Sequence, residues 1–182
     1  SRGLPGRGHD AIVPVAWAGV TDRGALTDGG GPVAQLTPCL WFYSGDAIEA
    51  FTRYVEIFSR YGEARILSDG DVIVECELDG QRVQGINGGP ADFAHSPAFS
   101  MSVLCQGAEQ VDHYWDSLVE GGEPSQCGWL VDRWGISWQI VPRELMTYMS
   151  DPDPAKAAAT RDAMLAMSKI DVAALKAAHD NA

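Results

Sequence analysis

The order strand, helix, three strands is predicted twice along this chain, and this repeat is the feature that most restricts its fold. The first copy covers about residues 36–90 and the second about residues 98–142, and their helices begin about 62 residues apart. Two such copies predict an α+β fold made of paired βαβββ modules. A helical C-terminal tail follows them.

Turn signals and apolar periodicity place the elements of the first copy. The segment 37–43 predicts a strand, and Asp46 offers an N-cap for a helix whose apolar residues recur at helical spacing from Ala47. Asp69-Gly70 and Asp79-Gly80 are hairpin signals. The strands that they separate are expected at 63–67, 71–78 and 81–86.

The second copy repeats this order with a tryptophan-rich end. A strand is expected at 99–105, and a hairpin with its turn at 132–135 leads into a last strand at 136–141. In the turn, Asp132 forms a local ion pair with Arg133 or caps the turn, and Gly135 takes a positive φ.

The two ends of the chain differ from the repeat. Eight of the twenty glycines lie in the first 31 residues, and 1–33 is expected to be a loosely ordered extension. A cleaved signal peptide around AIVPVAWAGV is the alternative. Residues 143–182 predict helices with Asp153 and Asp171 as N-caps. The expected divisions are therefore 1–33, 34–142 and 143–182.

Charge and cysteine usage exclude several classes of protein. The net charge of −12 argues against nucleic-acid and anionic membrane partners, which require clustered Lys and Arg. The four cysteines form no CxxC pair, so neither a zinc knuckle nor a thioredoxin-type site is encoded. A reducing cytoplasm is the expected location. No apolar run reaches the ~20 residues of a membrane span.

Four segments resemble a known family: TPCLWFYSGDAIEAF, ELDGQRVQGINGGP, SQCGWLVDRWGISWQIVP and SDPDPAKAAATRDAMLAMSKIDVAALKAA. They are similar to the PhnB-like proteins, often labelled 3-demethylubiquinone-9 3-methyltransferase. That group belongs to the vicinal-oxygen-chelate superfamily, with glyoxalase I, bleomycin-resistance proteins and extradiol dioxygenases. The resemblance covers about residues 35–178. It implies sheets that curl around a cup, usually completed in a homodimer.

The resemblance also implies where a metal would be held, because metal-bearing members use His, Glu or Gln on the first and last strands of each module. Here neither 37–43 nor 99–105 contains His or Glu, and Gln84 and Gln139 stand near the expected acidic positions. Two amides cannot replace imidazoles and carboxylates, so we expect no metal and no cofactor. Of the histidines, His113 is expected to be solvated.

The methyltransferase label has no physical basis in the sequence. The glycine cluster at 28–33 does not join a strand to a helix, as a cofactor-binding turn of that enzyme class would require.

The candidate ligand-binding residues are Trp41, Gln84, Asn87, Cys127 and Gln139. Strand alternation groups Gln139 with Ser137 and Val141 on one face, and Arg82 with Gln84 and Ile86. Trp41 or Phe42, but not both, then faces the cup. Packing is the simpler role for Cys127, and His95 is expected to be a loop residue near the cup entrance.

The resulting hypothesis is a metal-free protein that binds an apolar or aromatic small molecule. Whether it catalyses a reaction is left open. A metal-dependent lyase or dioxygenase of the same superfamily is one alternative, and a filled cup with function at the dimer surface is another.

Overall fold

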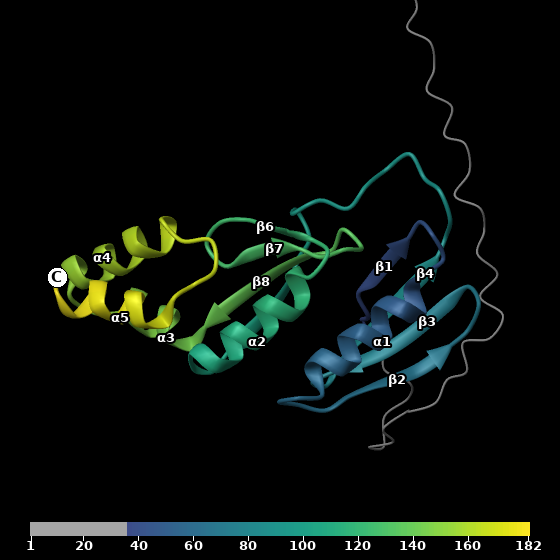
Figure 1. Ribbon diagram of the computed structural model, residues 1–182, viewed down its shortest axis with the longest axis horizontal. Helices are drawn as coiled ribbons and strands as arrows, with labels where there is room; N and C mark the ends of the chain where they lie inside the picture. Colours follow the sequence, from purple (N-terminus) through teal and green to yellow (C-terminus); the bar gives the residue numbers. More distant parts are fainter. Residues whose placement is uncertain (1–35) are drawn as a thin grey trace, which may run out of the picture.

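The computed structural model describes residues 36–182, so the expectations for 1–33 lie outside the described residues. Two four-stranded sheets, each with a helix on one face, precede three helices at the C-terminal end (Figure 1). The strands are β1 (Cys39–Phe42), β2 (Ala64–Asp69), β3 (Ile73–Leu78), β4 (Gln81–Asn87), β5 (Met101–Cys105), β6 (Glu123–Pro124), β7 (Trp129–Val131) and β8 (Ser137–Pro142). The helices are α1 (Ala47–Phe58), α2 (Gly107–Val119), α3 (Arg143–Met149), α4 (Pro154–Leu165) and α5 (Val172–Asp180).

Both sheets have the same topology, which confirms the predicted repeat. The first sheet has the order β1-β4-β3-β2 and the second β5-β8-β7-β6. In each, the first and last strands of the module pair in parallel and the other pairs are antiparallel. The second module is less regular than expected, because β6 has only two residues and β7 three.

Several predicted local features are confirmed. Asp79 and Gly80 both have positive φ, at 49° and 80°, as a two-residue hairpin loop requires. Gly135 has φ 84°. The side chains of Asp153 and Asp171 cap α4 and α5.

The sequence predicted that the side chain of Asp46 caps α1, and this prediction is wrong. Asp46 stands at the N-cap position but makes no side-chain capping bond. The Asn87 Oδ1 atom instead accepts a hydrogen bond from the Ala47 backbone N–H at 3.0 Å. A residue forty positions later in the chain therefore satisfies the helix end.

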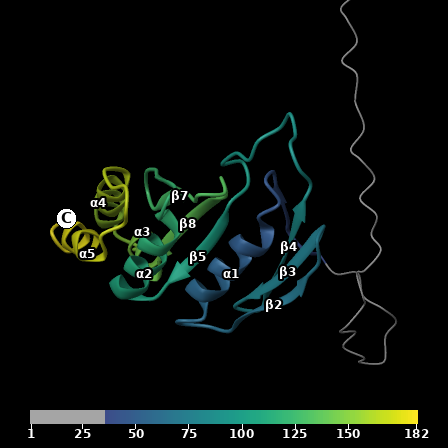
Figure 2. The same ribbon diagram turned by 45° about the vertical axis from the view of Figure 1, so that its right-hand side comes forward.

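The inner faces of both sheets share one hydrophobic core with α1 and α2, and the two helices lie side by side (Figure 2). The ring of Trp138 on β8 lies 5.2 Å from that of Tyr54 and 5.9 Å from that of Phe58, both on α1. The helix of the first module thus packs against the sheet of the second as well as its own.

The C-terminal helices form a second, smaller core around Leu145, Ile170 and Leu175 and attach to the start of β7. The Cys127 N–H donates to the Met167 carbonyl and the Gly128 N–H to the Ser168 carbonyl, each at 2.8 Å. Within residues 36–182 no helix is long and apolar enough to span a membrane.

Candidate functional site

Because both sheets turn their inner faces to the shared core, their outer faces carry the candidate polar residues. Phe42 is buried against Phe51 on the inner side, whereas Trp41 lies on the outer face of the first sheet. The predicted alternation is confirmed here, since Val83 is buried in the core and Gln84 lies on the opposite face.

Strand register arranges the outer face of the first sheet in three rows. The first row is apolar and contains Trp41, Ile86 and Ile73. The second row is polar and contains Cys39, Gln84 and Glu75. The third row is charged and contains Arg82, Glu77 and Arg65. The face therefore changes from apolar to ionic over three rows.

Glu75 is the centre of the polar part of this face. Its carboxylate accepts from the Gln84 amide at 3.3 Å and lies 3.7 Å from the Arg82 guanidinium, while its side chain is only 13% exposed. Two long contacts leave acceptor capacity on a carboxylate, which has about four lone-pair sites. The neighbouring ion pair, Arg65 with Glu77, is tighter at 2.7 Å.

Sequence reasoning missed Glu75 and Glu77 as residues of this face. The signal was present in VIVECEL, where the two glutamates alternate with Val74, Cys76 and Leu78. Alternation alone assigns them to the face opposite the buried residues, the one that carries Gln84.

The apolar end of the face is partly covered by the connection between the modules. The rings of Phe93 and Trp41 meet edge to face at 5.3 Å, and Trp41 Nε1 donates to the Gly89 carbonyl at 3.0 Å. His95 Nε2 lies 2.7 Å from the Trp41 carbonyl oxygen, so this histidine fixes the connection to β1. A Cβ atom at Gly88 would lie 2.0 Å from the Trp41 ring, which explains the glycine there.

Asn87, a predicted ligand-binding residue, has both ends of its amide engaged by the backbone. Its Oδ1 accepts from Ala47, as described above, and its Nδ2 donates to the Asp71 carbonyl at 2.9 Å. The geometry gives Asn87 a structural role in joining β4, α1 and the β2–β3 loop.

Gln139 lies on the outer face of the second sheet, where its Nε2 donates to Ser100 Oγ at 2.8 Å. Ser102 and Trp129 are its register partners on the neighbouring strands. A cavity of about 270 Å³ adjoins this face between Ser137 and the 94–99 segment, which includes His95. Gln84 and Gln139 thus belong to different sheets and are not brought together within one chain.

Cys127 lies two residues before Trp129, the register partner of Gln139, at the contact with the C-terminal segment described above, and has a positive φ of 57°. Among the other cysteines, burial raises the pKa of Cys76 and of Cys105 to about 12, so these thiols stay protonated and pack as apolar groups.

Gln84 and Gln139 lie on different sheets, so one chain does not bring these two amides to the same metal ion. In the described part of the chain, no three His, Cys, Asp or Glu side chains are grouped so as to hold a metal ion.

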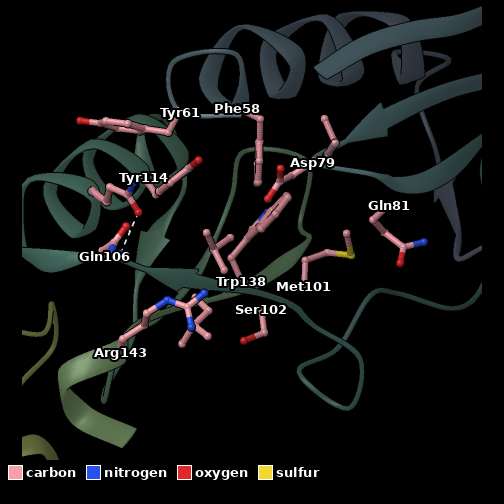
Figure 3. Close-up of a pocket in the computed structure, with 14 residues that line it drawn as sticks. Phe58, Tyr61, Asp79, Gln81, Met101, Ser102, Gln106, Tyr114, Trp138 and Arg143 are labelled. Atoms are coloured by element: carbon pink, nitrogen blue, oxygen red, sulfur yellow. Dashed lines mark hydrogen bonds between the residues drawn. The ribbon is translucent and has the colours of Figure 1, made fainter. Parts of the chain in front are cut away.

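A larger cavity, of about 390 Å³, lies between the two modules (Figure 3). Phe58 and Tyr61 line it from the α1 end, Asp79 from the β3–β4 turn, Tyr114 from α2, and Arg143 from α3. None of the five predicted site residues lines it.

Comparisons with known proteins agree with the fold. The sequence model of one family, 3-demethylubiquinone-9 3-methyltransferase, matches residues 34–141, more than half of the chain. No curated protein matches the sequence.

Solved structures are similar to this chain over about 60% of its length. The PhnB protein of Bacillus cereus is 26% identical, with a TM-score of 0.53 over 60% of this chain and 99% of that one. A Pseudomonas aeruginosa protein is 16% identical, with a TM-score of 0.49 over 60% and 98%. A glyoxalase-related enzyme of Fulvimarina pelagi is 13% identical, with a TM-score of 0.42 over 60% and 88%. The family model shows that this chain belongs to the 3-demethylubiquinone-9 3-methyltransferase family, and the similarity to the PhnB protein agrees with it.

Proposed function

We propose that the protein binds a small organic molecule, without a metal ion, on the outer face of the first sheet. The proposal rests on the change in polarity across this face. The apolar row of Trp41, Ile86 and Ile73 lies next to the hydrogen-bonded pair of Gln84 and Glu75. An aromatic or apolar body would pack on the first row, and its polar group would meet the amide and the carboxylate.

A second copy of the chain completes the site in this proposal. The outer faces of the two sheets both point away from the shared core, so one chain cannot enclose a ligand between Gln84 and Gln139. In a homodimer, the second sheet of the partner would supply the opposite wall. Sedimentation or light scattering would then give twice the 19.5 kDa chain mass. A monomer at micromolar concentration would contradict the shared site.

The family's methyltransferase description is not part of the proposal. Gly88 and Gly89 follow β4 and lead into the connection to β5 rather than into a helix, so they do not form a cofactor-binding turn. The four cysteines, two of them buried, are free thiols, which supports a reducing compartment, and the cytoplasm is proposed.

The test is a screen of aromatic and apolar compounds for a rise in melting temperature, followed by calorimetric titration of the compounds that bind. Replacing Gln84 with Leu removes the amide at nearly constant volume and should weaken binding about tenfold or more, since it deletes a hydrogen bond and leaves Glu75 less well paired. Arg161→Gln, on the exposed side of α4, is the matched control. Unchanged affinity in the Gln84 variant would contradict the site.

The metal-dependent lyase or dioxygenase is the rival, and metal analysis separates the two. Elemental analysis of purified protein and a melting-temperature screen with Mn²⁺, Ni²⁺, Fe²⁺ and Zn²⁺ should show less than stoichiometric metal and no large shift. One tightly bound ion per chain, with a shift of several degrees, would replace our proposal with the rival.

A further inference from the structure

We infer that the cavity between the modules is a second binding site, for a single-ring aromatic zwitterion. It is separate from the outer-face site, because Trp41, Gln84, Glu75 and Gln139 do not line it. Its volume of about 390 Å³ lies within the range of small-molecule pockets in proteins.

Aromatic rings form the floor of this cavity. The Phe58 ring lies 5.0 Å from the Tyr114 ring and 5.9 Å from the Trp138 ring, and all three residues line the space. A ligand ring would stack on or meet the edges of these side chains, as aromatic rings prefer to do.

The wall formed by β5 offers hydrogen-bonding groups. Met101, Ser102, Val103 and Leu104 are consecutive and all line the cavity. Since alternate side chains of a strand point to opposite faces, four consecutive lining residues place the cavity along the edge of the strand. Among residues 36–182 β5 is an edge strand, so in this part of the chain its backbone N–H and C=O groups on the side away from β8 have no strand partner.

Tyr114 provides a polar group directed at the ligand. Tyr114 is only 6% exposed and lines the cavity. Within residues 36–182 its hydroxyl makes no hydrogen bond. Burial raises the pKa of Tyr114, so the hydroxyl stays protonated at neutral pH and can donate to a ligand. The hydroxyl atom itself is accessible, since the buried side-chain oxygens without a partner among the described residues are those of Tyr43 and Glu144, so it can bond to water or to a ligand in the cavity.

Opposite charges lie at the two ends of the cavity. Figure 3 shows Asp79 and Arg143 on either side of Trp138. Among the described residues neither side chain forms a salt bridge, so the Arg143 guanidinium is available to a carboxylate and the Asp79 carboxylate to an ammonium group. This pairing selects an aromatic compound that carries the two groups at opposite ends of its ring.

The experiment compares four matched probes by calorimetric titration: 4-(aminomethyl)benzoate, 4-methylbenzoate, 4-methylbenzylamine and 4-methylbenzyl alcohol. The first carries its two charges at opposite ends of one ring, as the positions of Asp79 and Arg143 require. 4-(Aminomethyl)benzoate should bind at least about tenfold more tightly than either singly charged probe. Arg143→Gln should remove the advantage of the carboxylate-bearing probes, and Asp79→Asn that of the amine-bearing probes. Tyr114→Phe should weaken all four, and Arg161→Gln should weaken none.

Melting curves of each variant establish that it is folded. Asp79→Asn keeps a residue that tolerates the positive φ of the turn, so its fold is expected to persist. If no probe binds, or if the folded Arg143 and Asp79 variants bind 4-(aminomethyl)benzoate as tightly as the parent chain, the inference is wrong. If the neutral alcohol binds more tightly than the zwitterionic probe, the cavity takes an apolar ligand and the inference of a zwitterion is wrong.

Discussion

At the scale of single residues, the buried carboxylate of Asp132 joins helix α1 to the second module. Its Oδ2 accepts from the Tyr54 hydroxyl at 2.5 Å and from Trp138 Nε1 at 2.8 Å. Its Oδ1 accepts from the backbone N–H groups of Trp134 and Ile136. The sequence left open an ion pair with Arg133 or a turn cap, and the structure shows the cap. Arg133 instead donates to the Glu120 carbonyl.

Replacing Asp132 with Asn should lower the free energy of unfolding by about 1–3 kcal/mol. An amide nitrogen facing Trp138 Nε1 leaves that buried donor without an acceptor, whereas the Tyr54 hydroxyl can rotate to accept. Urea denaturation followed by fluorescence measures the loss. Asp162→Asn on the exposed side of α4 should change stability by less than about 0.5 kcal/mol. Equal stability of the two variants would contradict this role.

The same residue predicts a pH dependence. Burial raises the pKa of Asp132 above 3.8, against the lowering effect of its hydrogen bonds. The native state then holds this proton more tightly than the unfolded state, so its contribution to stability decreases as pH rises from about 3.8 through the folded-state pKa. The stability difference between the parent chain and Asp132→Asn should therefore shrink over that range. A difference that grows with pH would show a lowered pKa instead.

At the scale of elements, helix α1 depends on a cap from outside its own sequence neighbourhood. Asn87, at the end of β4, binds the Ala47 N–H, and this bond links the last strand of the module to its only helix. The backbone groups of a helix start need such partners.

Asn87→Ala should lower the free energy of unfolding by about 0.5–2 kcal/mol, the usual cost of a lost N-cap. Asp46→Ala should cost less, because the Asp46 side chain makes no capping bond. Thermal unfolding of the two variants gives the order directly. A larger loss of stability in the Asp46 variant would show that the Asp46 side chain caps the helix, as the sequence predicted.

At the scale of the whole molecule, the C-terminal helices are held to the second module by Ile170. This side chain is 2% exposed and packs with Leu145 and Leu175, and a Cβ on Gly128 would meet its Cγ1 atom at 3.1 Å. The tail is thereby joined to the beginning of β7.

Ile170→Ala should cost about 2–4 kcal/mol, since it creates a cavity in the smaller core. Leu165→Ala, at a side chain that is 55% exposed, is the matched control and should cost far less. Guanidinium unfolding monitored by circular dichroism compares the two. If the losses are equal, the tail does not depend on this contact.

The sequence by itself determined the features that depend on neighbouring residues. The two modules, the strand faces, the turn at Asp79-Gly80 and the caps of α4 and α5 follow from local periodicity and turn chemistry, and the structure confirms them. Alternation also separated Trp41 from Phe42 without any knowledge of the fold.

Only the tertiary structure decided which distant residues meet. His113 was expected to be solvated, and this was wrong, because its Nε2 lies 2.8 Å from the Ile57 carbonyl across the contact between α1 and α2. The cap from Asn87, the contact of Glu75 with Gln84 and the cavity between the modules likewise join separate segments. Sequence patterns record the periodicity of one element, whereas these contacts depend on how elements pack, and no single segment carries that information.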